Sequence, residues 1–150
     1  MVRPMRPHWL LLCLVPLVAL ATGGGLPAGM IRVPAEKIVW VDGTPPFPPT
    51  VKVAVLEGDP SSNGFFTVRV KFPAGAVLPM HVHPVDERST VLSGTVYVGT
   101  SAPVEKSNGI KLEAGSFYLN KKDEPHWFMA ETEVVLQIST NGPWAVKKLP

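Results

Sequence analysis

Short runs of alternating apolar and polar residues, each closed by a turn signal, fill the chain from Val51 onward. In the clearest run, residues 66–72, apolar side chains take every second position and Thr, Arg and Lys lie between them. A period of two is typical of a β-strand with one buried face. The same reasoning predicts strands at 51–56, 76–82, 89–98, 117–120, 126–129, 134–140 and 144–148. The Ser-Asn-Gly sequence at 107–109 predicts a hairpin, and Gly94 is expected to bend the strand that contains it.

The number and spacing of these strands indicate the fold class. They are short and regularly spaced, and no stretch after residue 21 has a convincing helical period, so we expect an all-β sandwich or closed barrel. The chain has 150 residues, which is room for one domain, and no internal repeat is visible. Residues 51–150 are therefore interpreted as one β-barrel.

A Pro- and Gly-rich extension, residues 22–50, precedes this domain. Its Thr-Pro-Pro-Phe-Pro-Pro-Thr stretch at 44–50 is expected to be extended and unable to join a central strand ladder. Residues 37–40 are expected either to form a short strand that covers a sheet edge or to belong to a flexible tether.

Residues 1–21 have the pattern of a secretory signal peptide. Arg3 and Arg6 precede an apolar run from Leu10 to Leu20, and Ala-Leu-Ala at 19–21 is a small-x-small cleavage site. The run is too short for a stable bilayer span, which needs about 20 residues. We therefore expect an exported protein, periplasmic or secreted, with no stable membrane span after removal of the signal. The alternative is a buried N-terminal helix.

The composition of the chain after this leader excludes some classes of partner and ligand. Two of the 14 Lys and Arg residues lie in the leader, which leaves 12 against 12 Asp and Glu. A neutral domain without a basic cluster predicts no nucleic-acid partner. Cys13, the single cysteine, also lies in the leader, so the remaining chain has no thiolate ligand and no intramolecular disulfide.

Three histidines and a glutamate form the clearest candidate site: His81, His83, Glu87 and His126. His81 and His83 are two apart on a predicted strand, so their rings project to one face with Cα atoms about 6.6 Å apart. Glu87 opens the next strand beside them, and the alternation favours it over Asp86. Three imidazoles and a carboxylate suit one divalent transition metal, which could be Fe, Mn, Ni, Cu or Zn.

Strand parity also predicts the residues around the site. Those that share the inward parity are Val68, Val70, Phe72, Ser89, Val91, Phe128, Leu136 and Ile138. They are candidates for a substrate pocket, and for each apolar one the alternative is plain core filling. Trp127 alternates outward from His126 and is interpreted as a packing or rim residue.

The spacing of these residues resembles the first cupin motif, a Gly, five residues, His-x-His, three or four residues, Glu, six residues and Gly. Gly75, His81, His83, Glu87 and Gly94 match it at every position. In the second motif Gly115 and His126 match. Lys121, Asp123 and Ala130 stand where Pro, Gly and Asn are usual, and these departures affect the expected loop shape rather than the ligand.

The resemblance covers residues 51–148 and is to the small single-domain form of the cupin superfamily. It implies a jelly-roll β-barrel that binds a metal inside through the four residues named. Two functions stay open: a metal-dependent oxygenase of the dioxygenase type acting on a small organic molecule, and a non-catalytic module that binds or senses a metal or small molecule. A barrel whose histidines are core residues is the third alternative, and a homodimer is expected to be possible because barrel strands are exposed.

Overall fold

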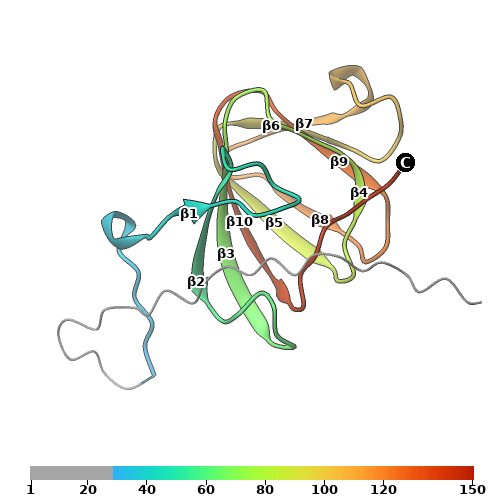
Figure 1. Ribbon diagram of the computed structural model, residues 1–150. Helices are drawn as coiled ribbons and strands as arrows, with labels where there is room; N and C mark the ends of the chain where they lie inside the picture. The colour runs from blue at the N-terminus through green and yellow to red at the C-terminus, as the bar shows by residue number, and fades with distance from the viewer. Residues whose placement is uncertain (1–28) are drawn as a thin grey trace, which may run out of the picture.

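Two antiparallel sheets make up the part of the chain that the structure, a computed structural model, describes, residues 29–150 (Figure 1). The six-stranded sheet has the order β1 (Val41–Asp42), β2 (Lys52–Glu57), β3 (Phe65–Phe72), β10 (Val134–Asn141), β5 (Glu87–Ser93) and β8 (Phe117–Asn120). The five-stranded sheet has the order β11 (Lys147–Lys148), β4 (Val77–Val82), β9 (His126–Ala130), β6 (Thr95–Gly99) and β7 (Ile110–Glu113). The all-β jelly-roll prediction is confirmed.

Gly94 carries the chain from one sheet to the other. The prediction of one strand across 89–98 becomes two strands, because β5 ends at Ser93 and β6 begins at Thr95 in the opposite sheet. Gly94 has φ = 81°, and a Cβ there would collide with the carbonyl oxygen of Glu133. A side chain at this position would therefore be strained both by its backbone conformation and by its neighbour.

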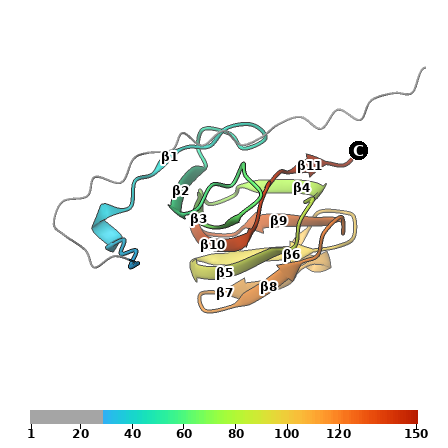
Figure 2. The ribbon, with the colours of Figure 1, turned by 90° about the horizontal axis from the view of Figure 1, so that it is seen from below.

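Figure 2 shows how the strands of the two sheets wrap around a common interior. The hydrophobic core fills the space between the sheets. In the central β3–β10 pair, Val70 lies opposite Leu136 and Val68 lies opposite Ile138, and all four side chains are buried. The parity assignments are correct here because every second residue of a strand faces the same side of its sheet. The apolar members of the core are Phe47, Val51, Val53, Phe66, Val68, Val70, Phe72, Val91, Val96, Phe128, Ala130, Val134, Leu136, Ile138, Trp144 and Val146.

The extension before Val51 contributes to the barrel. A short 3-10 turn, η1 (Ala35–Lys37), occupies part of the segment where a strand was one alternative, and pairing begins at β1, where Val41 lies opposite Val53. Phe47, in the Pro-rich stretch, is buried in the core. The predicted signal peptide and Cys13 lie outside the described residues. Within residues 29–150, no helix is long and apolar enough to cross a membrane.

Two further segments differ in detail from the predictions. The Ser-Asn-Gly sequence lies in a long β6–β7 connection with a 3-10 turn, η2 (Lys106–Asn108), rather than in a tight hairpin turn. Only the last part of the strand predicted at 144–148 forms, as β11, which pairs with β4. Trp144 is not in a strand, and its side chain is buried in the core.

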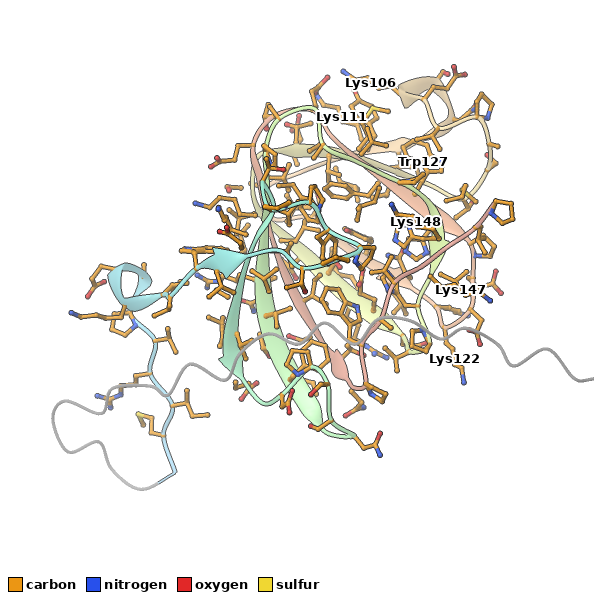
Figure 3. All side chains as sticks on the ribbon, viewed as in Figure 1. Lys106, Lys111, Lys122, Trp127, Lys147 and Lys148 are labelled. Atoms are coloured by element: carbon orange, nitrogen blue, oxygen red, sulfur yellow. The ribbon has the colours of Figure 1, made fainter. Side chains whose placement is uncertain are left out.

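Trp127 is a packing residue rather than a rim residue. Its ring lies against Gly99 and Gly109, where a Cβ would leave no room for the indole. Its Nε1 donates a 2.8 Å hydrogen bond to the Ser101 carbonyl, so the β6–β7 connection covers it (Figure 3).

Candidate metal centre

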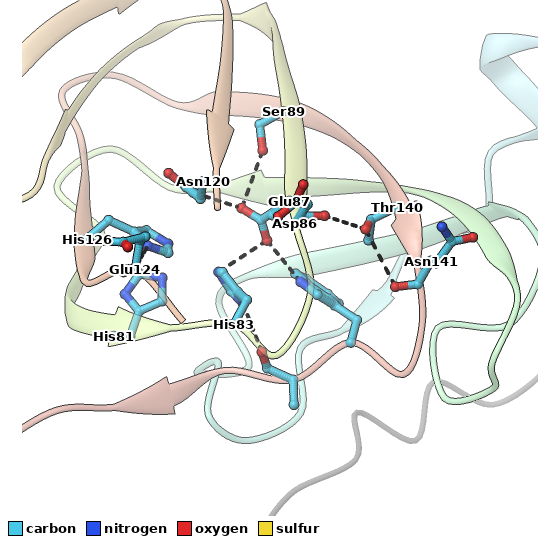
Figure 4. Close-up of polar contacts among 12 residues, drawn as sticks. His81, His83, Asp86, Glu87, Ser89, Asn120, Glu124, His126, Thr140 and Asn141 are labelled. Carbon is cyan, nitrogen blue, oxygen red and sulfur yellow. Dashed lines mark hydrogen bonds and ion pairs between the residues drawn. The ribbon is translucent and has the colours of Figure 1, made fainter. Parts of the chain in front are cut away.

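The three predicted histidines meet between β4 and β9. His81, near the end of β4, lies directly opposite His126, the first residue of β9, and His83 follows two residues later. Their exposed fractions are only 3%, 2% and 5% for His81, His83 and His126. One nitrogen from each ring belongs to a group of donor atoms that all lie within 4.8 Å of one another (Figure 4). The structure thus brings together the imidazoles that the sequence singled out.

Backbone carbonyls fix the orientation of all three rings. The Nδ1 atoms of His81, His83 and His126 lie 2.6, 2.8 and 2.9 Å from the carbonyl oxygens of Pro79, Ala145 and Glu124, respectively. A carbonyl oxygen only accepts, so each Nδ1 carries a proton, and Nε2 is the nitrogen left in each ring to bind a metal. Histidines that bind metals are usually oriented in this way. The His126 Nε2 is buried without a hydrogen-bond partner, as a nitrogen reserved for an ion would be.

Burial favours the neutral form of two of these imidazoles, His81 and His126. The pKa of His81 is lowered to about 4, mainly because burial removes its solvation and to a smaller extent because His126 and His83 lie nearby. Burial also lowers the pKa of His126, although its hydrogen bond with Glu124 opposes the shift. At neutral pH His81 and His126 are therefore in the uncharged form that a metal requires.

Glu87, the first residue of β5, is buried beside His83. Its Oε2 lies 3.2 Å from the His83 Nε2 and accepts a 2.9 Å hydrogen bond from the Trp144 indole. Its Oε1 accepts hydrogen bonds from the Asn120 amide at 3.2 Å and the Ser89 hydroxyl at 3.4 Å. Burial raises the pKa of Glu87, but His83, His126 and the Trp144 bond outweigh it and lower that pKa, so the group is a carboxylate. Direct binding of a metal by Glu87 stays a prediction.

Asp86 points away from the cluster. Its Oδ1 accepts a 3.0 Å hydrogen bond from the Lys122 backbone, and its half-exposed side chain lies 3.4 Å from Arg88. Glu87, on the opposite parity, faces the histidines, which is the orientation that alternation predicts.

A small cavity adjoins the histidines. Its volume is about 20 Å³, which is room for roughly one water-sized particle. The lining residues are Phe47, Phe72, Leu78, His81, His83, Glu87, Val98, Tyr118, Asn120, His126, Trp127, Phe128, Leu136, Ile138 and Trp144. Among the pocket residues proposed from parity, Phe72, Phe128, Leu136 and Ile138 line this space. Val68, Val70 and Val91 are buried in the core away from it, and Ser89 reaches the site only through Glu87.

Sequence reasoning missed several residues around the site, including Leu78 and Val98. Asn120 and Tyr118 lie on β8, whose register places Asn120 opposite Glu87, so a knowledge of strand pairing would have found them. Burial and the nearby Glu87 raise the pKa of Tyr118, which stays protonated. Phe47 comes from a Pro-rich segment with no strand period, and Trp144 begins a segment that was predicted as a strand; no local signal marks either residue as part of the site.

The donor set fits a divalent transition metal. Three imidazoles that converge through one nitrogen each, with an adjacent buried carboxylate, suit a cation. His81, His83 and His126 are the residues that would hold the ion.

Comparison with solved structures shows the same fold. The polyketide cyclase RemF from Streptomyces resistomycificus is 15% identical, with a TM-score of 0.62, over 81% of this chain and 86% of that protein. An RmlC-like cupin from Shewanella frigidimarina is 19% identical, with a TM-score of 0.57, over 71% of this chain and 86% of that protein. A variant of salicylate 1,2-dioxygenase from Pseudoaminobacter salicylatoxidans, in complex with gentisate, is 16% identical, with a TM-score of 0.53, over 66% of this chain but 29% of that protein.

Comparison with family models gives a match over most of the chain, whereas comparison with curated proteins gives none. The matching model, described as Domain of unknown function (DUF4437), spans residues 27–147, which includes the barrel, the extension from Val41 and all three histidines. The chain belongs to this DUF4437 family, and its jelly-roll barrel has the fold of the cupin structures.

Proposed function

We propose that this protein is a metal-binding cupin in which His81, His83 and His126 hold one divalent transition metal, with the Glu87 carboxylate beside it. The observation that carries the proposal is the shared orientation of the rings. All three Nδ1 atoms are engaged by backbone carbonyls, and the remaining nitrogens converge within 4.8 Å. A histidine that served only as a core residue would not need its Nε2 to face two others.

We further propose that the metal centre serves oxygenase chemistry on a small organic molecule, with Fe, Mn or Ni as the metal; Cu and Zn fit the same donors. A metal in such a site acts as a Lewis acid and as a template that orients its ligands. The chain supplies an apolar surround, from Phe72, Phe128 and Leu136, that excludes water, and Glu87 as the acceptor for a proton. The similarity in fold to a dioxygenase solved with gentisate agrees with this proposal.

A second candidate is a non-catalytic module that binds or senses a metal or a small ligand. The size of the cavity favours it, because about 20 Å³ is room for roughly one water-sized particle. Under this proposal the protein binds its ligand and releases it unchanged.

One pair of experiments separates these candidates. Protein purified from its native host is first analysed for bound metals, and oxygen uptake by the Fe, Mn and Ni forms is then measured with a panel of phenols, diketones and thiols. Metal-dependent oxygen uptake with any member supports the oxygenase. A compound that binds in calorimetry without being consumed by any metal form supports the binding module.

The proposed export and homodimer need their own tests. N-terminal sequencing of the secreted or periplasmic protein should give a start close after Ala21, whereas a start at Met1 or Val2 would remove the export proposal. Light scattering after size-exclusion chromatography measures the mass in solution. A mass of one chain at all concentrations contradicts a dimer.

A further inference from the structure

The Glu87 Oε2 lies 3.2 Å from the His83 Nε2, but no oxygen of this carboxylate lies within 4.8 Å of all three converging histidine nitrogens. Ligand atoms on one transition metal lie about 2.0–2.2 Å from it, so any two of them are at most about 4.4 Å apart. The one group of converging donors found among residues 29–150 comprises the three histidines and does not include Glu87. Both of its oxygens also accept hydrogen bonds from side chains outside the histidine cluster.

Three side-chain donors account for both Glu87 oxygens. Oε1 receives Asn120, which lies opposite it in the β5–β8 register, and Ser89, which is two residues further on the same face. Oε2 receives the Trp144 indole at 2.9 Å, the shortest of the three bonds. A buried carboxylate with three donors is well satisfied, so moving it onto an ion requires breaking these bonds.

Trp144 is the most constrained of the three donors. Its ring is stacked on His83 with 6.0 Å between centroids and 22° between planes. On its other sides it packs against Phe47 and Phe66, with centroids 6.0 and 6.1 Å away. The indole therefore cannot rotate away without disrupting the core, and its N–H direction is fixed by packing.

We propose that Glu87 does not coordinate the metal directly, and that Trp144 is the positioning residue that holds its carboxylate as a hydrogen-bond acceptor beside a three-histidine ion. This inference rests on the proposed function, because it presumes an ion at the histidine cluster. A three-histidine ion has more coordination positions for outside ligands than an ion with four protein donors. The Glu87 carboxylate then lies where a water or hydroxyl group bound at the cluster can donate a hydrogen bond to it.

Cobalt spectroscopy tests the assignment without any assay of activity. The full chain is loaded with Co²⁺, whose visible absorption reports the number and type of its ligands. The wild type and Glu87→Gln should give the same bands, because neither supplies a carboxylate ligand. Trp144→Phe should shift the bands, because Oε2 is released to coordinate, and Trp144→Phe combined with Glu87→Gln should restore the wild-type spectrum.

Trp40→Phe is the control. It also replaces an indole by a phenyl ring, but Trp40 lies beside Lys71 and does not line the cavity, so the wild-type bands should remain. If Trp144→Phe does not fold, the double variant Ser89→Ala/Asn120→Ala frees Oε1 and should give a band shift that Glu87→Gln abolishes.

Three results would overturn the inference. A spectrum that changes in Glu87→Gln alone would make Glu87 a ligand in the wild type. Wild-type bands in the folded Trp144→Phe protein would show that the indole does not restrain the carboxylate. Absence of Co²⁺ uptake by the wild type would refute the proposed metal site itself, and this outcome is distinct from the other two.

Discussion

Replacement of Phe47 by alanine should destabilise the barrel strongly, although Phe47 lies in a Pro-rich segment with no strand period. The side chain is 4% exposed and packs edge-on against Phe72 and beside Trp144, each with ring centroids 6.0 Å away. Deletion of a buried phenylalanine side chain costs about 3–5 kcal/mol of unfolding free energy. Against a typical total of about 5–15 kcal/mol, this loss is large.

The assay is equilibrium unfolding in urea, followed by tryptophan fluorescence at pH 7. Phe65→Ala is the matched control, because the side chain of Phe65 is 56% exposed, and its loss should cost less than about 1 kcal/mol. If the two variants differ by less than about 1 kcal/mol, the segment before Val51 is not packed into the barrel as described, and the cavity beside the histidines lacks one of its walls.

Three further predictions concern the site and the turn between the sheets. The pKa of His81 is lowered to about 4 in the folded state, so the unfolded state binds more protons below pH 6.5. The free energy of unfolding of the metal-free protein should therefore fall by up to about 3 kcal/mol between pH 6.5 and pH 4. A free energy of unfolding in urea that does not change across this range would contradict the prediction. Glu87→Gln should weaken metal binding by about 10- to 100-fold in competition with a chelator, whereas Asp86→Asn should change it less than about twofold; equal effects would mean that the carboxylate is misassigned. Gly94→Ala should cost more than about 2 kcal/mol in urea, since its φ is 81° and its Cβ would meet the Glu133 carbonyl, and a neutral substitution would refute the tight crossing between β5 and β6.

Local alternation predicted most of the strands and the orientation of their side chains. Val68, Val70, Leu136 and Ile138 are buried as their parity requires, and Glu87 rather than Asp86 faces the histidines. These predictions are correct because the direction of a side chain on a strand depends on its neighbours in sequence. The histidine trio was identifiable for the same reason, with His126 as the additional histidine expected from a facing strand.

Other features of the site depend on contacts between distant segments, which no local pattern encodes. Trp144 was placed in a strand, yet it leaves the strand register to donate to Glu87, which precedes it by 57 residues. Phe47 closes the cavity from a segment that looked like a linker. Three carbonyls orient the imidazole rings, and a backbone acceptor has no signature in the residue type.

The measurement that tests the central claim most directly is the metal content of the purified full-length protein, determined by elemental analysis beside the triple variant His81→Ala/His83→Ala/His126→Ala. The account predicts close to one transition-metal ion per wild-type chain and almost none in the variant, with both proteins folded by circular dichroism. A folded wild type that takes up no transition metal from a solution containing it, or a variant that retains the ion, would contradict the assignment of these three histidines.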